Sequence, residues 1–169
     1  MTLSQSSNAP YQSVHVSSAL TSTQLNALGI RGVDYSDAAV SGTTLTLGSQ
    51  TLTVVDMTDD FKGLSPAFSS NRLPRESVGD SVANSRPGRQ VFAMTSTMYV
   101  NYTEGHSYDA FYKNARDIRA IIAERDEAGE GFVGLWYVQS RTEQAVDDNG
   151  DVVFDVVFEY ASKTPVYFL

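Results

Sequence analysis

The chain has 169 residues and a mass of 18.4 kDa, enough for one domain with its own hydrophobic core. It has no cysteine and only two histidines, which excludes disulfides, thiolate metal sites and cysteine nucleophiles. Its 12 basic and 20 acidic side chains give a net charge of −8, which opposes general binding to nucleic acid or anionic membranes. We expect no catalytic residue, no cofactor and no metal site, and a function carried by surfaces.

The domain organisation follows from changes in composition along the chain. Residues 1–20 are rich in serine at their start and are expected to form a flexible or extended N-terminal arm, followed by a single domain over residues 21–169. Residues 56–89 show no periodicity and are punctuated by glycine and proline, so they predict a long irregular loop. A loop of that length in a compact domain usually has a function or becomes ordered on binding.

Two short elements are predicted before that loop. Thr21 or Ser22 can cap a short helix that carries Leu25 and Leu28 and that Gly29 ends. Further on, threonine alternates with aliphatic residues on both sides of the sequence Gly-Ser-Gln at 48–50. This pattern predicts a β-hairpin over residues 44–55.

The second half of the chain is more strongly patterned. Apolar and polar residues alternate over 91–103, which predicts a half-buried strand. Ser107 can cap a helix that ends at Gly129 and is expected to be the main helix of the domain. Its apolar stripe has helical spacing and consists of Phe111, Ala115, Ile118 and Ile122.

Two more strands are expected after this helix. Residues 132–138 are apolar on both faces, as in a central strand, and residues 152–160 alternate again. The sequence Asp-Asp-Asn-Gly at 147–150 predicts a tight turn between them. The predicted fold class is therefore α+β: an antiparallel β-sheet with one main helix packed on a face, plus an N-terminal β-hairpin and a long irregular loop.

Sequence motifs for chemistry are weak. Residues 129–134 match the pattern GxGxxG, but they close a helix and open a strand, whereas a dinucleotide site needs the reverse order. The acidic pairs Asp59/Asp60 and Asp126/Glu127 are expected to be solvated. His15 and His106 are expected to be structural. A small hydrolase or ligand-binding domain stays open as an alternative, and a deep cavity holding His106 with a carboxylate would favour it.

The loop carries a local excess of arginine in an otherwise acidic chain. Arg72, Arg75, Arg86 and Arg89 lie in its second part, residues 72–89, against two acidic residues, Glu76 and Asp80. Guanidinium groups bind carboxylates and phosphates with two parallel hydrogen bonds, so these residues are candidates for docking onto an acidic surface of a neighbouring subunit. A solvated loop and direct contact with a DNA backbone are the alternatives.

The chain printed here closes with an apolar segment. Tyr167, Phe168 and Leu169 follow a proline and a valine. This segment predicts either a short edge strand packed on its own domain or an anchor in a pocket of a partner, so these three residues join the candidate subunit interface.

The second half resembles a known family. The strand over 90–103, the helical segment over 108–119 and the Asn-Gly hairpin that ends in Phe-Asp-Val-Val-Phe-Glu-Tyr at 154–160 are similar to the tail terminator (tail completion) proteins of long-tailed bacteriophages. The resemblance covers about residues 90–169. It rests on patterns of periodicity, and no catalytic residue is carried over by it. The first half, with its arm and loop, is longer than that fold requires.

The resemblance implies a structural virion protein rather than an enzyme. It implies a homo-oligomer, expected to be a hexameric ring at the head-proximal end of the tail, which stops tube polymerisation and joins the tail to the head. The implied partners are the tail tube protein and the head-completion or stopper protein, with DNA passing through the ring without specific binding and no membrane involved. The implied location is the tail or neck of the virion, after assembly in the host cytoplasm. Another neck, tube or baseplate subunit is the alternative.

Overall fold

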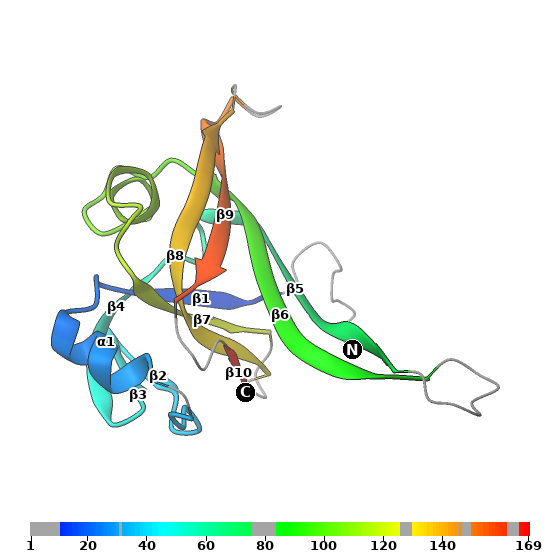
Figure 1. Cartoon of the computed structure of the whole chain (residues 1–169). Helices are drawn as coiled ribbons and strands as arrows, with labels where there is room; N and C mark the ends of the chain where they lie inside the picture. The colour runs from blue at the N-terminus through cyan, green and yellow to red at the C-terminus, as the bar shows by residue number, and fades with distance from the viewer. Residues whose placement is uncertain are drawn as a thin grey trace, which may run out of the picture.

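Most of the protein is one antiparallel β-sheet of ten strands (Figure 1). In this computed structural model the strand order is β2-β3-β4-β1-β7-β8-β9-β6-β5, and β10 also pairs with β8. The structure describes residues 11–30, 32–75, 84–125, 130–144, 146, 150–161 and 166–169, and for 68–75 and 84–91 the backbone alone. The elements are β1 (Ser13–Ser17), α1 (Ser22–Leu28), β2 (Ala39–Ser41), β3 (Thr44–Leu47), β4 (Gln50–Asp56), β5 (Phe61–Arg75), β6 (Asn84–Tyr99), η1 (Tyr108–Lys113), β7 (Arg119–Glu124), β8 (Gly131–Glu143), β9 (Val153–Tyr160) and β10 (Val166–Phe168).

The short helix and the first hairpin confirm the sequence prediction. Thr21 caps α1 with a reciprocal capping box to Gln24, and Gly29 ends the helix. Strands β3 and β4 pair from Thr44↔Thr53 to Leu47↔Gln50, which leaves the two-residue turn Gly48-Ser49 with both φ angles positive. That is the geometry whose twist matches a tight hairpin, so local residue chemistry was sufficient to predict both elements.

The predicted α+β class is wrong, because the expected main helix from Ser107 to Gly129 does not form. Strands hold 52% of the chain and helices 11%. The helical part of this segment is the π-helix η1, and the apolar residues after it form β7; Gly129 lies outside the described residues. β7 is buried on both faces, so its apolar residues run continuously and imitate a helical stripe. The adjacent Ile121 and Ile122 favour a strand because β-branched side chains fit a pleated sheet.

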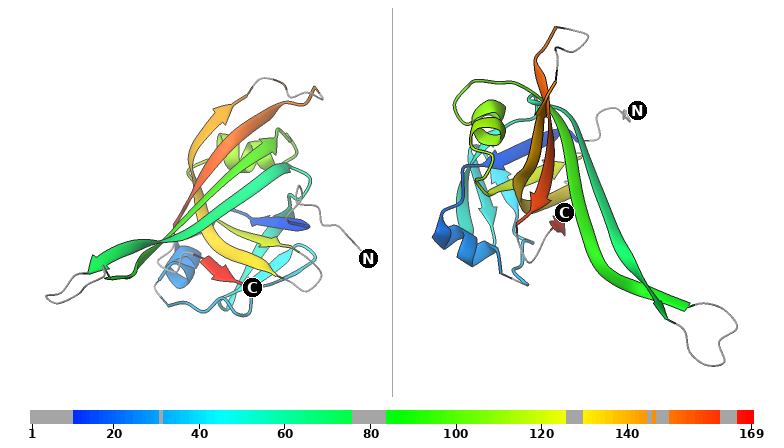
Figure 2. Two further views of the ribbon diagram at one scale, coloured as in Figure 1. Left: turned by 90° about the vertical axis from the view of Figure 1, so that its right-hand side faces the viewer. Right: turned by 45° about the horizontal axis from the view of Figure 1, so that its top comes forward.

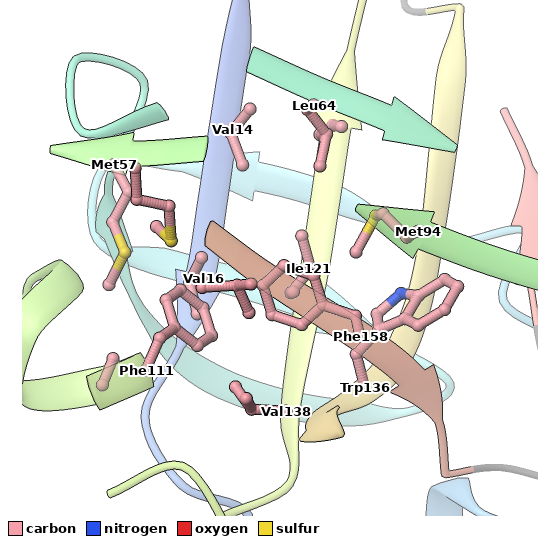
Figure 3. Packing of buried hydrophobic residues seen from close by; sticks show 14 of the residues in the cluster. Val14, Val16, Met57, Leu64, Met94, Phe111, Ile121, Trp136, Val138 and Phe158 are labelled. Atoms are coloured by element: carbon pink, nitrogen blue, oxygen red, sulfur yellow. The ribbon is translucent and has the colours of Figure 1, made fainter. Parts of the chain in front are cut away.

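Two hydrophobic clusters lie on opposite faces of the central strands. Ile121 and Ala123 of β7 face the first cluster, which Figure 3 shows around Val16, Phe111 and Trp136 between β1, β7, β8 and the strands β5, β6 and β9. Ala120 and Ile122 face the second cluster, which α1 and strands β3 and β4 cover. This double burial makes β7 and the first half of β8 the centre of the fold.

The predicted irregular loop is also wrong over most of its length. Residues 61–75 and 84–99 form β5 and β6, a long antiparallel hairpin whose pairing runs from Phe61↔Met98 to Arg75↔Asn84. Residues 13–17, within the segment 1–20 that was expected to be flexible or extended, form the strand β1 between β4 and β7. Strand β1 belongs to the sheet because Val14 and Val16 are buried in the first cluster.

The later strands confirm their predictions. In β6, Phe92, Met94 and Met98 are buried, and β8 pairs with β7 on one edge and with β9 and β10 on the other. Of the turn expected at 147–150, only Gly150 is described, with φ 88°. Among the residues that the structure describes, no helix is long and apolar enough to cross a membrane.

Gly131 marks a close approach of two backbones at the start of β8. A Cβ added there would lie 1.9 Å from the carbonyl oxygen of Ala123, and a backbone atom cannot move aside cheaply. We predict that Gly131→Ala destabilises the fold by about 1–3 kcal/mol or more through overpacking. Gly63→Ala is the matched control, because nothing lies within 4 Å of its added Cβ. Urea denaturation of both variants checks this, and equal stability would contradict it.

Candidate assembly surfaces

The hairpin of β5 and β6 extends well beyond the sheet. β9 pairs with β6 only along Met94–Tyr99, so past that point β5 and β6 pair with each other alone. We call the two-stranded part over residues 67–75 and 84–93 the arm. Figure 2 shows it projecting away from the rest of the molecule. A two-stranded ribbon in water is only marginally stable by itself, and within the described residues no further strand pairs with the arm.

The four arginines predicted as interface residues all lie on this arm. Arg72 and Arg75 are on β5, and Arg86 and Arg89 are on β6. The register places Arg72 opposite Pro87, and Arg86 opposite Leu73, so the backbone brings them close to one another near the far end of the ribbon. Their side chains lie outside the described part of the structure.

The apolar segment at 166–169 packs on its own domain. β10 pairs with β8 through Phe168↔Phe132, and Tyr167 and Leu169 pack against the second hydrophobic cluster. Phe168 remains 56% exposed. Of the two alternatives for this segment, the structure has the short strand packed on its own domain. The segment pairs with β8, whereas the four arginines lie on the arm.

One face of the sheet formed by β5, β6, β9 and β8 is polar. Where these strands lie side by side, the residues that alternate with the buried ones share this outer face, and a hollow of about 380 Å³ lies on it. The face carries the carboxylates of Asp155 and Glu159, and the exposed Lys62 lies at its margin, in the β-bulge between Phe61 and Gly63. Asp155 accepts hydrogen bonds from Thr97 and Gln144. We call this the polar face; its residues are Gly63, Ser65, Thr95, Thr97, Ser140, Thr142, Asp155, Val157 and Glu159.

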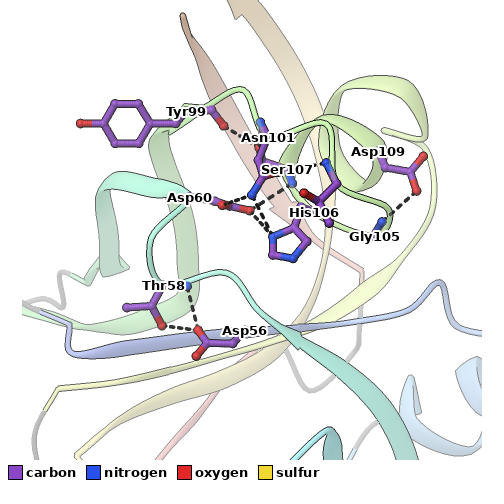
Figure 4. Close-up of polar contacts among 10 residues, drawn as sticks. Asp56, Thr58, Asp60, Tyr99, Asn101, Gly105, His106, Ser107 and Asp109 are labelled. Carbon is purple, nitrogen blue, oxygen red and sulfur yellow. Dashed lines mark hydrogen bonds and ion pairs between the residues drawn. The ribbon is translucent and has the colours of Figure 1, made fainter. Parts of the chain in front are cut away.

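The base of the hairpin is held together by a buried carboxylate (Figure 4). Asp60, 4% exposed, directly precedes β5 and accepts hydrogen bonds from Asn101 Nδ2 at 2.8 Å, His106 Nδ1 at 2.9 Å and the Ser107 amide at 3.2 Å. The hydroxyl of Ser107 donates to the carbonyl of Tyr99. Buried carboxylates are stable when several donors satisfy them, and here the donors come from the segment that follows β6. The two loops are thus locked together.

This cluster bears on the hydrolase alternative. His106 does meet a carboxylate, but neither the hollow on the polar face nor a second hollow beside Tyr11 and Phe168 is lined by these residues. Ser107 has no exposed surface, and its hydroxyl is engaged with Tyr99 and with the amide of Asn101. A nucleophile must reach a substrate, so this geometry serves to fix loops rather than to carry out hydrolysis.

Sequence reasoning missed the role of Asp60. The pair Asp59/Asp60 was expected to be solvated, and that is correct for Asp59 only. The pair Asp126/Glu127 lies outside the described residues. The sequence did offer a local sign of a turn just before β5: Asp56 accepts hydrogen bonds from the amide and the hydroxyl of Thr58. This sign does not identify what Asp60 binds. The partners of Asp60 are more than 40 residues away, so no local pattern could reveal them.

Comparisons with known proteins give a likeness of fold. No family model and no curated protein matches the sequence. A chain from the virion of a native gene transfer agent particle is similar with a TM-score of 0.51 at 13% identity, over 78% of this chain and 99% of that one. A chain from the tail of an empty gene transfer agent particle with C6 symmetry has a TM-score of 0.49 at 10% identity, over 65% of this chain and 82% of that one. A chain of the SPP1 tail tube has a TM-score of 0.43 at 15% identity, over 61% of this chain and 62% of that one.

These solved structures come from virion and tail particles. At these identities the likeness establishes the fold, which this chain shares with a component of the gene transfer agent virion.

Proposed function

We propose that this chain is a structural subunit of a virion tail, repeated in a ring around a channel. The observation that carries the proposal is the arm, a two-stranded ribbon that no third described strand pairs with and in which only the base residue Phe92 is known to pack on the core. An element of that kind gains stability only against another subunit. The shared fold with a component of the gene transfer agent virion supports the same function.

The polar face suits the wall of a channel for DNA. Asp155 and Glu159 give it negative charge, and five of its other residues are serine or threonine: Ser65, Thr95, Thr97, Ser140 and Thr142. A hydrogen bond to Glu159, together with desolvation and the charge of that carboxylate, raises the pKa of Tyr137 above its usual value, so this neighbouring phenol stays neutral. A surface of this charge repels phosphates, so DNA would pass along it without specific binding.

The position of the ring in the tail is the finer part of the proposal. A tail terminator, as the sequence resemblance implies, would occupy the head-proximal end and contact the tail tube protein and the head-completion protein. A tube subunit would repeat along the tail. Cryo-electron microscopy of particles, with antibody labelling, distinguishes the two: one collar near the head identifies a terminator, and label along the tail identifies a tube subunit. Absence from purified particles would contradict both.

The arginines of the arm are predicted to strengthen assembly. Replacing two of them by serine removes about two surface ion pairs of roughly 0.7 kcal/mol each, which raises the protein concentration needed for half-assembly about tenfold. Arg72→Ser with Arg75→Ser, and Arg86→Ser with Arg89→Ser, should each show this, and all four together about a hundredfold. Light scattering with native mass spectrometry measures the assembled fraction.

The control for this prediction is Lys113→Ser with Arg116→Ser, two exposed cations outside the arm. It makes the same change in net charge as either arginine pair. Unchanged assembly of the fourfold serine variant would show that the arginines are merely solvated.

A further inference from the structure

The loops at the base of the hairpin form a second rigid surface at the end opposite to the tip of the arm. We call two segments the root loops: residues 56–60, from the last residue of β4 to the start of β5, and residues 100–107, which follow the end of β6 at Tyr99. Asp60 joins the two loops through the hydrogen bonds described above, and the amide of Tyr99 donates to the carbonyl oxygen of Asp60. A surface fixed in this way binds a partner without a large cost in ordering.

The exposed side chains of the root loops are acidic and aromatic. Asp56, Asp59 and Glu104 are exposed, and Tyr102 is 74% exposed. The root loops contain no lysine or arginine. Burial acts to raise the pKa of Asp56, but the hydrogen bonds from Thr58 and the nearby histidines outweigh it, and the pKa is lowered. This carboxylate therefore holds its negative charge.

The arm carries the complementary charge, and it cannot reach the root loops of its own chain. Its two strands contain four arginines and no acidic residue. Arg72 is twelve residues along β5 from Asp60, which at about 3.3 Å per residue is roughly 40 Å. Figure 1 shows the arm and the π-helix beside the root loops on opposite sides of the molecule. Any contact between these two surfaces must join separate copies.

We infer that the root loops of one copy bind the arginine-bearing arm of a second copy of this chain. Carboxylates accept guanidinium hydrogen bonds, and an exposed tyrosine ring offers a stacking face. The chain already uses this stacking twice: Arg141 lies 4.9 Å from the ring centre of Tyr112, and Arg125 lies 5.3 Å from that of Tyr11. The inference rests on the proposed function and names the partner surface of the arm.

Such a contact has a direction. The arm of one copy meets the root loops of the next, so the interface is heterologous. In each contact one copy keeps a free arm and the other keeps free root loops. Contacts of this type add further copies until a ring closes. Where no ring closes, they add copies to an open stack. Because the attraction is electrostatic at an exposed surface, assembly should weaken as salt rises.

The test neutralises the root loops in the full chain. Asp59→Asn with Glu104→Gln should raise the half-assembly concentration about tenfold, as loss of two ion pairs predicts, while circular dichroism stays unchanged. Ser41→Lys with Thr51→Lys makes the same change in net charge on exposed positions of β2 and β4, and it should assemble normally. Equal weakening of both variants would overturn the inference in favour of a general charge effect.

A charge exchange makes the test sharper. Arg72→Glu with Arg75→Glu, and Asp59→Arg with Glu104→Arg, should each fail to assemble alone and should assemble with each other when mixed. If arm variants lose assembly while every root-loop variant assembles normally, the arm binds elsewhere and the inference is wrong, although the proposed function stands. If neither the wild-type chain nor any variant forms a species larger than the monomer, the proposed function itself fails.

Discussion

A chain in which residues 69–91 are replaced by Asn-Gly should fold as a monomer and should not assemble. The replacement joins Phe68 to Phe92, which pair across β5 and β6, and Asn-Gly provides the two-residue turn that such a hairpin needs. The pairing of β6 with β9 and the buried side chains of the first cluster are kept. We expect a melting temperature within a few degrees of the wild type, because an isolated ribbon contributes little stability.

Assembly should fall below detection at concentrations where the wild type is fully assembled. Sedimentation velocity gives the species present, and far-ultraviolet circular dichroism confirms the sheet. The control is insertion of Gly-Ser in the turn after Gly42, at the β2–β3 connection, which alters a different hairpin. A truncated chain that still forms the wild-type species would contradict the role given to the arm.

Asp60→Ala should be among the most destabilising single substitutions in the chain. It removes the acceptor of three hydrogen bonds, and the Ser107 amide cannot turn to water because that residue has no exposed surface. Leaving buried donors unsatisfied costs about 1–3 kcal/mol, and more when a charged partner is lost, so we expect about 3 kcal/mol. Asp60→Asn keeps one acceptor oxygen and should fall between alanine and the wild type.

The neighbouring Asp59 provides the matched control. It is exposed, so Asp59→Ala should change the free energy of unfolding by less than about 0.5 kcal/mol. Urea denaturation of the monomeric, arm-deleted chain separates folding from assembly. Similar stability of the two alanine variants would show that the bonds to Asp60 do not hold the root loops.

The sequence predicted the elements that local chemistry determines. The capping residue Thr21, the turn Gly48-Ser49 and the alternation along β6 and β9 each depend on neighbours within a few positions, and each was correct. The helix expected after Ser107 was wrong because the burial of β7 on both faces depends on two clusters assembled from distant segments. The part of the arm up to residue 89 was expected to be a loop, because strands that do not pack on a hydrophobic core need not alternate apolar and polar residues.

The candidate surfaces were predicted in part. The four arginines were predicted as interface residues because local composition alone reveals an excess of positive charge. The polar face and the root loops required the register of β5, β6 and β9, since residues such as Thr97 and Asp155 become neighbours only through pairing. Asp59 and Asp60 show the limit most clearly: they are adjacent in sequence, yet one is exposed and the other buried.

The prolines of β5 and β6 have a consequence for the subunit before it assembles. Pro66, Pro74 and Pro87 lack an amide hydrogen, and the pairing shifts register between Ser70 and Arg72. Each of these features interrupts the regular row of donors and acceptors that lets bare strand edges stick to one another. We therefore expect the unassembled chain to resist edge-to-edge aggregation along these two strands.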